Sequence, residues 1–383
     1  MKLVVFSYKL VWENPDSPSG YATDGGFAFQ MSAISEIFEQ TVIAVPVSPT
    51  RMAKGEVFIQ GKNIVVFPLE NIKGHGLRRK INYIVWFLKN VWKFNKLIDN
   101  ADAVHTPIPS DIGTLGMILA RIKKKPLFVR YCGNWLIQST LAEKFWKWFM
   151  EKYAGGKNVM LATGLQSEEP SRKNANIKWI FSTSLTNTEI VELRKRIPKL
   201  NIETPRLITV CRMEERKGAE EVIRAVNLMR DTYPSIHLDV VGEGSELEKL
   251  KKMVNKFNLI KNVTFHGKLN HKNVLNSLKN SSVFCYPTTA SEGFPKVVLE
   301  ALATGLPVFG TGVSAIKALL EGGGGVILKD AKPETLVREL RNLFDNPEKY
   351  ILMQDQALAT AKEFSLENWR DAIKFHLQKA WGI

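Results

Sequence analysis

Two glutamates eight positions apart, Glu292 and Glu300, flank the segment with the clearest potential for chemistry. The apolar run Val283–Tyr286 precedes them, so we expect a strand, a loop containing Gly293, and then a helix with Pro295 in its first turn. A glycine lets a ligand approach the backbone closely, and the first N–H groups of a helix bind anions and hydroxyl groups. Carboxylates accept hydrogen bonds from hydroxyl groups, so the pair could hold two polyhydroxylated groups. On spacing alone, an ordinary helix start with two solvated acids is the alternative.

Short apolar runs alternate with amphipathic segments along the rest of the chain, and these are the elements that must position the two glutamates. The runs that predict strands are Leu3–Ser7, Thr41–Val47, Ile64–Phe67, Ala103–His105, Leu127–Tyr131, Leu207–Val210, Ile236–Val241, Val263–His266, Val283–Tyr286 and Pro307–Gly310. Helical patterns lie between them, for example at Gly218–Tyr233. This alternation predicts an α/β protein with parallel sheets covered by helices on both faces.

The length of 383 residues exceeds what one hydrophobic core usually supports, so we expect two domains. The patterning is weakest around residues 183–204, which places the predicted domains at 1–190 and 191–365, with a C-terminal helix at 366–383 packing back on the first domain. Three widely spaced cysteines argue against a disulfide framework or a zinc site and favour a reducing, cytoplasmic compartment. No apolar stretch has the length needed to span a bilayer.

The chain is strongly basic, with a formal net charge of +15. Residues 1–190 contain 24 lysines and arginines against 15 acids, so +9 lies there and +6 in the remainder. A balance of this size indicates an anionic partner, which is a nucleic acid, a membrane surface or a phosphorylated substrate.

Residues suited to phosphate binding follow several of the predicted strands. Arg212 and Lys217 come after Leu207–Val210, and Gly242 and Lys268 follow the next two strands. Cations directly after a strand and at a helix start can neutralise a diphosphate at the edge of an α/β sheet. Each signal alone is also typical of a solvated surface residue, but their order and even spacing favour one site.

Together these residues resemble the retaining, nucleotide-sugar-dependent glycosyltransferases of family 4, which have two Rossmann-like domains facing a central cleft in the architecture called GT-B. The resemblance is strongest over residues 205–330. It rests on Arg212 with Lys217-Gly218, on Gly242-Glu243-Gly244, and on Glu292-Gly293-Phe294-Pro295 with Glu300-Ala301. It implies a donor site made of Gly25, Gly26, Arg212, Lys217, Gly242, Lys268, Glu292, Gly293, Phe294, Pro295 and Glu300.

The resemblance also implies a role for each of these groups. Arg212 and Lys217 would hold the donor diphosphate and Glu300 the ribose hydroxyls. Glu292, with the backbone of Gly293 and Phe294, would hold the transferred sugar. The implied catalytic residues are Glu292, His105, Lys217 and Arg212.

Two features extend the resemblance into the first half of the chain. Asp24-Gly25-Gly26, before a helix predicted at Phe27–Phe38, matches a glycine loop that faces the donor phosphate and the acceptor. His105 stands where the family often carries a histidine at a strand end near the donor sugar, and a buried structural histidine is the alternative. The family's second histidine is replaced by Thr106-Pro107, and its histidine-glycine pair by Cys132-Gly133. These departures favour a specialised donor or acceptor.

The chemistry implied is hexosyl transfer with retention of anomeric configuration, by same-face substitution in which the departing phosphate takes the acceptor proton. Arg212, Lys217 and helix amides would stabilise the leaving group. No aspartate pair of the metal-binding kind follows a strand, so we expect neither a divalent metal nor a cofactor. A UDP-sugar is favoured over a GDP-sugar as donor.

The acceptor side is indicated by residues 71–98, which contain seven basic residues and no acid. On a helix, Ile81, Ile84, Val85, Leu88 and Trp92 form one apolar face, and Tyr83, Trp86, Phe87, Phe94 and Leu97 form a second. One face can pack on the sheet, while the other, flanked by cations, suits an anionic lipid surface. Segment 141–154 is similar. A helix buried on both sides and a dimer interface are the alternatives.

The sequence therefore predicts a glycosyltransferase that extends a lipid-linked saccharide in surface polysaccharide or glycan assembly. It would be cytoplasmic and peripherally bound to the inner face of the cell membrane through residues 72–98 and 141–154. A transferase acting on nucleic acid or protein, and a non-catalytic nucleotide-sugar-binding protein, are the alternatives. Nucleic acid is not expected as a partner.

Overall fold

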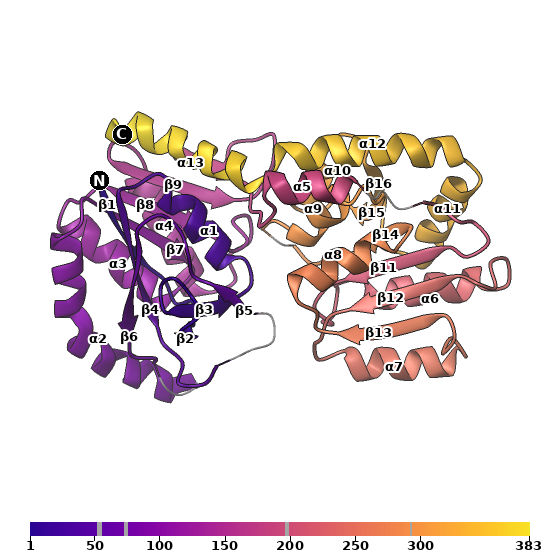
Figure 1. Cartoon of the computed structure of the whole chain (residues 1–383), viewed down its shortest axis with the longest axis horizontal. Helices are drawn as coiled ribbons and strands as arrows, with labels where there is room; N and C mark the ends of the chain where they lie inside the picture. Colours follow the sequence, from indigo (N-terminus) through magenta and orange to yellow (C-terminus); the bar gives the residue numbers. More distant parts are fainter. Residues whose placement is uncertain (52–55, 73–75, 196–198, 292) are drawn as a thin grey trace. The chain divides into compact units, whose positions relative to one another are not determined.

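A computed structural model describes residues 1–51, 56–72, 76–195, 199–291 and 293–383, apart from the side chains of residues 76–81. The chain divides into two compact units, shown in Figure 1. The N-terminal unit comprises Met1–Gly164, Glu168–Ser184 and Leu366–Ile383, and the C-terminal unit comprises Leu165–Ser167 and Leu185–Ser365. The change of unit at residue 185 comes a few residues before the boundary that the weak patterning suggests.

The N-terminal unit is built on a seven-stranded parallel sheet with the strand order β10-β9-β8-β7-β1-β4-β6. Its strands are β1 (Lys2–Phe6), β4 (Gln40–Pro46), β6 (Ile64–Leu69), β7 (Ala103–Ile108), β8 (Leu127–Tyr131), β9 (Asn158–Thr163) and β10 (Ile177–Ile180). A small antiparallel sheet, which the apolar runs do not predict, joins β2 (Trp12–Glu13), β3 (Tyr21–Asp24) and β5 (Glu56–Phe58).

Helices cover both faces of this sheet because successive residues of each strand point to opposite sides. Val4 and Phe6 of β1 lie in a core with α2 (Gly76–Asp99), α3 (Asp111–Ile122) and α4 (Leu141–Tyr153). The alternate residues Leu3 and Val5 lie in a second core with α1 (Phe27–Ser35) and α13 (Leu366–Trp381).

The C-terminal helix α13 thus belongs to the N-terminal unit. Trp369, Ile373 and Leu377 are fully buried there, at the four-residue spacing that places side chains on one face of a helix.

The C-terminal unit contains a six-stranded parallel sheet with the order β13-β12-β11-β14-β15-β16. Its strands are β11 (Arg206–Val210), β12 (His237–Val241), β13 (Val263–Gly267), β14 (Val283–Tyr286), β15 (Val308–Thr311) and β16 (Gly325–Leu328). The chain starts at β11, proceeds outward to β13, and returns to β14 on the other side of β11. Such a reversal is where α/β sheets bind ligands, at the carboxyl ends of the strands.

Eight helices are described in this unit. They are α5 (Asn187–Arg194), α6 (Ala219–Met229), α7 (Leu247–Lys256), α8 (His271–Lys279), α9 (Lys296–Ala303), α10 (Ala315–Leu320), α11 (Pro333–Phe344) and α12 (Pro347–Glu363). One core joins residues of α6, α7 and α11 to Leu207, Leu238 and Val240 of the sheet. Helix α8 contacts β11, and helix α9 contacts β14.

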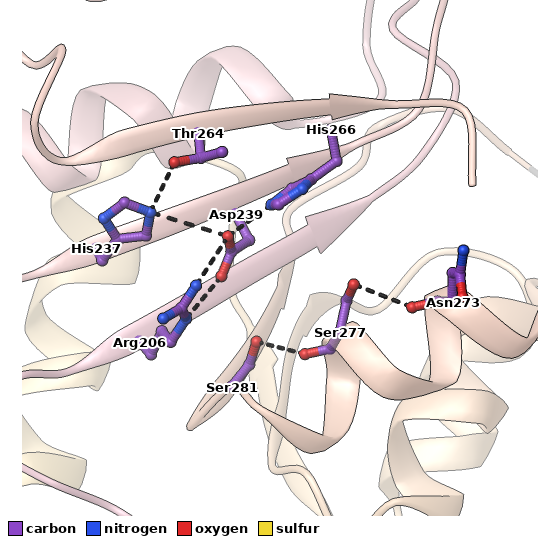
Figure 2. A network of polar contacts seen from close by, with 8 residues as sticks. All are labelled: Arg206, His237, Asp239, Thr264, His266, Asn273, Ser277 and Ser281. Atoms are coloured by element: carbon purple, nitrogen blue, oxygen red, sulfur yellow. Dashed lines mark hydrogen bonds and ion pairs between the residues drawn. The ribbon is translucent and has the colours of Figure 1, made fainter.

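A charged cluster connects three neighbouring strands of this sheet (Figure 2). The buried carboxylate of Asp239 accepts two hydrogen bonds from the Arg206 guanidinium, at 2.9 and 3.2 Å, and its Oδ1 lies 2.7 Å from Nε2 of His266. Burial acts to raise the pKa of Asp239, but Arg206 and then His266 outweigh it, so the pKa is lowered. The cluster therefore holds β11, β12 and β13 together through a buried negative charge.

Candidate functional site

A cavity of about 520 Å³ opens at the carboxyl ends of the central strands of the C-terminal sheet. Its residues come from the ends of β11, β12 and β14, from the loops that follow β11, β12 and β13, and from α8 and α9. They are Val210, Cys211, Arg212, Lys217, Val241, Gly242, Glu243, Lys268, Leu269, Val274, Tyr286 and Val297. Four predicted site residues, Arg212, Lys217, Gly242 and Lys268, are thus brought together at the chain reversal.

The charged part of the lining is predominantly positive, with three cations against the single carboxylate of Glu243. The Arg212 guanidinium is exposed and pairs with Glu214 at 2.8 Å, so it remains accessible to an anion. Lys217 is buried, with 6% of its surface exposed. A cation held in a largely desolvated position interacts more strongly with an anion than a surface cation does.

Lys217 is positioned by contacts between two loops. The carbonyl of its neighbour Arg216 accepts hydrogen bonds from the Thr288 hydroxyl and the Thr289 amide, both at 2.9 Å. The Arg216 guanidinium donates in return to the Thr289 carbonyl at 2.9 Å. The loop after β11 and the loop after β14 are therefore connected immediately beside the cavity.

Two glycines allow the backbones around the cavity to approach one another. Gly242 has φ +134°, and a Cβ at this position would lie 1.8 Å from the carbonyl oxygen of Cys211. Gly218 has φ +95°, and its Cβ would lie 2.8 Å from the carbonyl carbon of Pro287. Any side chain at either position would displace a loop of the cavity.

The segment before α9 is described only in part. Glu292, one of the two glutamates that the sequence emphasises, lies outside the described residues. Phe294 is buried, with its ring centroid 6.2 Å from that of Phe364. Pro295 occupies the N-cap position and α9 begins at Lys296, so the expectation of proline in the first turn is wrong by one residue. Gly293, another residue of the predicted donor site, lies in the same connection between β14 and α9.

Glu300 lies on α9, one turn beyond the cavity-lining residue Val297. Its side chain is 12% exposed, and Oε1 lies 3.4 Å from Nδ1 of His271. Glu300 is thus beside the cavity and paired with a histidine that the sequence motifs do not indicate.

His105 is fully buried in the N-terminal unit. Its ring stacks on Phe128 with a centroid separation of 4.1 Å, and Nδ1 lies 3.0 Å from the carbonyl oxygen of Phe128. Burial, and then the charge of Arg130, lower its pKa to about 3, so the imidazole is neutral. The expectation that His105 ends its strand is wrong, because β7 continues through Pro107 to Ile108.

The glycine loop of the N-terminal unit precedes α1 as expected. Gly25 has φ +66°, with no atom within 4 Å of the position of a Cβ, and Gly26 is the N-cap residue. Helix α1 ends at Ser35 rather than at Phe38.

The apolar side of the cavity, which the sequence motifs do not predict, comprises Leu269, Val274, Tyr286 and Val297. Tyr286 ends β14, so the strand-end criterion that selects Arg212 also applies to it. The helical residues Val274 and Val297 have no such signal, because apolar residues on α8 and α9 are equally typical of the core. Within the described part of the chain, no group of three or more His, Cys, Asp or Glu residues could hold a metal ion.

A second candidate surface lies on α2 and consists of Ile84, Val85, Leu88 and Trp92, hereafter the α2 apolar strip. The side chain of Ile81, which the sequence places on the same face, lies outside the described residues. These four side chains are between 49% and 66% exposed. The opposite face packs on the sheet, with Trp86 and Phe94 buried and Tyr83, Phe87 and Leu97 partly buried against the same core. Lys89, which follows Leu88 in the sequence, is also exposed. Of the two apolar faces that the sequence predicts, one is therefore used by the fold and the other is not.

The aromatic residues of α4 are mostly used by the fold. Phe149 is buried, and Phe145 and Trp146 pack against the same core, with Nε1 of Trp146 donating to the Thr114 hydroxyl at 2.7 Å. Trp148 stays 48% exposed. The predicted similarity of segment 141–154 to the α2 apolar strip is thus limited. Among the described helices, none is both long and apolar enough to cross a membrane.

The C-terminal unit is similar in sequence to known glycosyltransferases. The family model described as Glycosyl transferases group 1 matches residues 192–359. An uncharacterized glycosyltransferase of Haemophilus influenzae is 28% identical over 186 residues, 48% of this chain and 51% of that protein. A GDP-mannose-dependent alpha-(1-6)-phosphatidylinositol monomannoside mannosyltransferase of Mycolicibacterium smegmatis is 25% identical over 175 residues, 44% of this chain and 45% of that protein. The chain spans about half the length of these curated relatives.

Among solved structures, Anabaena Alr3699/HepE in complex with UDP and glucose is similar, with a TM-score of 0.69 at 15% identity over 98% of this chain and 99% of that chain. At this identity the similarity shows the fold, which is two parallel-sheet α/β domains. Residues 192–359 thus match the glycosyl transferases group 1 family, and the chain shares the fold of two parallel-sheet α/β domains with the Anabaena protein.

Proposed function

We propose that this protein is a retaining glycosyltransferase, which binds a nucleotide-diphosphate sugar in the cavity of the C-terminal unit and transfers the sugar to an acceptor hydroxyl. The observation that carries the proposal is the composition of that cavity. Arg212, Lys217 and Lys268 supply positive charge for a diphosphate, and Leu269 and Val274 belong to an apolar side suited to a nucleobase. The group 1 domain over residues 192–359 supports the same activity.

The transfer breaks the bond between the anomeric carbon and the donor phosphate oxygen and forms a bond from the acceptor oxygen to that carbon. The nucleoside diphosphate leaves with the electron pair, and the acceptor proton moves to the departing phosphate oxygen. Lys217, held by the loop contacts of Arg216, would stabilise the charge that develops on the leaving group. Glu292 and the backbone at Gly293 would hold the transferred sugar, and Glu300 the ribose, as the family resemblance implies.

The donor is proposed to be a UDP-hexose, and the reaction to need no metal. The similar Anabaena structure contains UDP and glucose, whereas the Mycolicibacterium relative is described as GDP-mannose-dependent. Both descriptions name a nucleoside diphosphate with a hexose, which is the chemistry that the cations and the apolar side of the cavity suit.

The acceptor is proposed to be a lipid-linked saccharide at the cytoplasmic face of an anionic membrane. The α2 apolar strip supports this, because Leu88 and Trp92 are exposed beside Lys89 and the segment 71–98 contains no acid. Apolar side chains flanked by cations favour the interface of an anionic leaflet. The description of the Mycolicibacterium relative names a phosphatidylinositol mannoside.

The activity is tested by measuring release of nucleoside diphosphate from UDP-glucose and from GDP-mannose. We expect Lys217→Ala to lower kcat/KM about a hundredfold or more, because a buried cation at the leaving group acts mainly in the transition state. The matched control is Lys252→Ala on the outer helix α7, with turnover unchanged. Equal turnover by Lys217→Ala and wild type would contradict the site, and nucleotide binding without turnover would indicate a non-catalytic binding protein.

A further inference from the structure

His271 brings together carboxylates from two other helices. It is the first residue of α8, with Asn270 as the N-cap. Its Nδ1 lies 3.4 Å from Oε1 of Glu300 on α9, and its Nε2 lies 4.0 Å from Oε1 of Glu189 on α5. One imidazole ring therefore interacts with α9 and α5 from the start of α8.

Glu189 is itself held in place. Its Oε2 accepts hydrogen bonds from the Thr186 amide and the Thr186 hydroxyl, both at 2.9 Å, in the capping box of α5. A carboxylate with these contacts has little rotational freedom. Glu189 therefore places a fixed negative charge near Nε2 of His271, whereas Glu300 lies near Nδ1.

The ring is beside the candidate nucleotide cavity. Leu269, two residues before His271, and Val274, three residues after it, both line that cavity, as does Val297 one turn before Glu300. His271 is 26% exposed, so its pair with Glu300 is only partly accessible to water.

The charges around the ring favour the imidazolium form. Burial acts to lower the pKa of His271, but the hydrogen bond and charge of Glu300, followed by the charge of Glu189, outweigh it, and Lys296 acts weakly in the opposite direction. The pKa is therefore raised above its usual value. An imidazolium can donate from Nδ1 to Glu300, while Glu189, at 4.0 Å from Nε2, acts on the ring through its charge.

We propose that His271 is a positioning residue for the nucleotide ribose: it anchors Oε1 of Glu300 against the fixed Glu189, and so orients Oε2 to accept hydrogen bonds from the ribose hydroxyls. The proposal rests on the proposed function, because it requires a nucleotide in the cavity. His271 acts through Glu300 and does not touch the ligand. An anchored carboxylate loses less rotational freedom on binding than a mobile one does, which favours affinity.

The test compares two nucleotides that differ only in the ribose hydroxyls. Affinities of the full chain for UDP and for 2′,3′-dideoxy-UDP are measured by titration calorimetry, with the GDP pair in parallel. Hydrogen bonds to a charged group predict that wild type prefers the nucleotide with hydroxyls about tenfold or more. We expect His271→Gln to reduce this preference to the level of Glu300→Gln. The matched control is His237→Gln, which keeps the wild-type preference because His237 begins β12 at the end of the strand opposite the cavity.

A pH series on the wild type provides a readout that needs no folded variant. The folded pKa of His271 is raised, so its charge is present below that pKa and is lost as the pH rises through it. The preference for the nucleotide with ribose hydroxyls is therefore expected to decrease as the pH rises through the pKa of His271. A loss of stability alone in His271→Gln would lower Tm without changing the preference.

The possible results distinguish the positioning role of His271 from the nucleotide binding on which it rests. If wild type prefers UDP or GDP over its dideoxy analogue and His271→Gln keeps that preference, the positioning role is overturned and the nucleotide site stands. A preference in wild type that does not change with pH also overturns it. If neither nucleotide binds the wild type, both proposals fail together.

Discussion

In the C-terminal unit cations and apolar residues gather inside a cavity, whereas in the N-terminal unit they lie side by side on an exposed helix. Lys217 is buried where β11 meets α6, and loop contacts fix it there. Leu88 and Trp92 on α2 lie on the face opposite the buried Phe94, and the fold makes no use of them. The same two kinds of residue thus form a shaped site in one unit and a flat surface in the other.

The proposed function assigns a different kind of ligand to each of these two surfaces. A cavity with fixed cations suits a small molecule whose charge and shape are constant, such as a nucleoside diphosphate. A flat apolar strip with cations beside it suits a partner without fixed shape, and an anionic bilayer is such a partner. In this proposal the N-terminal unit would bind the protein to the membrane surface, and the C-terminal unit would recognise the nucleotide donor.

The largest difference in stability is expected between substitutions on the two faces of α2. Phe94→Ala removes a fully buried ring that stacks on Phe6 at 4.4 Å, and we expect it to lower the free energy of unfolding by about 3–5 kcal/mol. Trp92→Ala removes an exposed ring and is expected to change it by less than about 0.5 kcal/mol. Chemical denaturation of both variants measures the difference. A large loss in Trp92→Ala would show that the strip is part of the fold.

The next effect compares glycines in the two units. Gly242→Ala would place a Cβ 1.8 Å from the Cys211 carbonyl oxygen at φ +134°, so we expect a loss of about 3 kcal/mol and loss of nucleotide binding. Gly25→Ala has the unfavourable φ of +66° but open space, and is expected to cost about 1 kcal/mol. Thermal and denaturant unfolding of each variant provides the measurement. Equal costs would mean that the close packing around the cavity relaxes without penalty.

The charged cluster of the C-terminal sheet predicts a pH dependence. Asp239→Asn removes the charged partner of Arg206 and His266, and we expect a loss of about 2 kcal/mol at neutral pH. The folded pKa of Asp239 is lowered, so its stabilisation is complete above the unfolded pKa of about 3.9 and is lost as the pH falls through the folded pKa. The stability gap between wild type and variant, measured by denaturation against pH, is expected to close in that acid range. A gap that stays constant into acid would contradict this assignment.

The smallest expected effect is on vesicle binding by the α2 apolar strip. We expect the double substitution Leu88→Ser with Trp92→Ser to weaken co-sedimentation with phosphatidylglycerol-containing vesicles about tenfold or more, because two apolar side chains no longer enter the interface. The matched control is Ile351→Ser with Leu352→Ser, an equally exposed pair on α12 of the C-terminal unit. Equal loss in both variants would contradict a specific role for the α2 apolar strip.

Three of the four predicted residues of the cavity directly follow an apolar run, and the fourth, Lys217, stands just before the next helix. Arg212, Gly242 and Lys268 come at or just after strand ends, and parallel strands bring their carboxyl ends to the same edge of the sheet. The two faces of α2 follow equally from its periodicity, although the sequence does not tell which face is packed.

Other features depend on packing that no local pattern encodes. His271 and Glu300 lie on different helices separated by β14, so their contact follows from how α8 and α9 rotate against each other. The length of the strand that contains His105 is hard to predict for a different reason. Proline removes a hydrogen-bond donor and is rare in central strands, and the predicted strand ends at His105. The strand β7 nevertheless continues through Pro107, which pairs with Arg130 of β8 and lies beyond the last residue that pairs with β1.

Nucleotide binding in the C-terminal unit is measured most directly by hydrogen–deuterium exchange of the whole chain with and without UDP, and with GDP in parallel. Ligand binding protects the amides that it contacts or orders. We predict protection in the loops around the cavity, at residues 210–218, 241–244, 267–274 and 286–300. Exchange that is unchanged there, with protection confined to the N-terminal unit, would contradict a nucleotide site in the C-terminal unit.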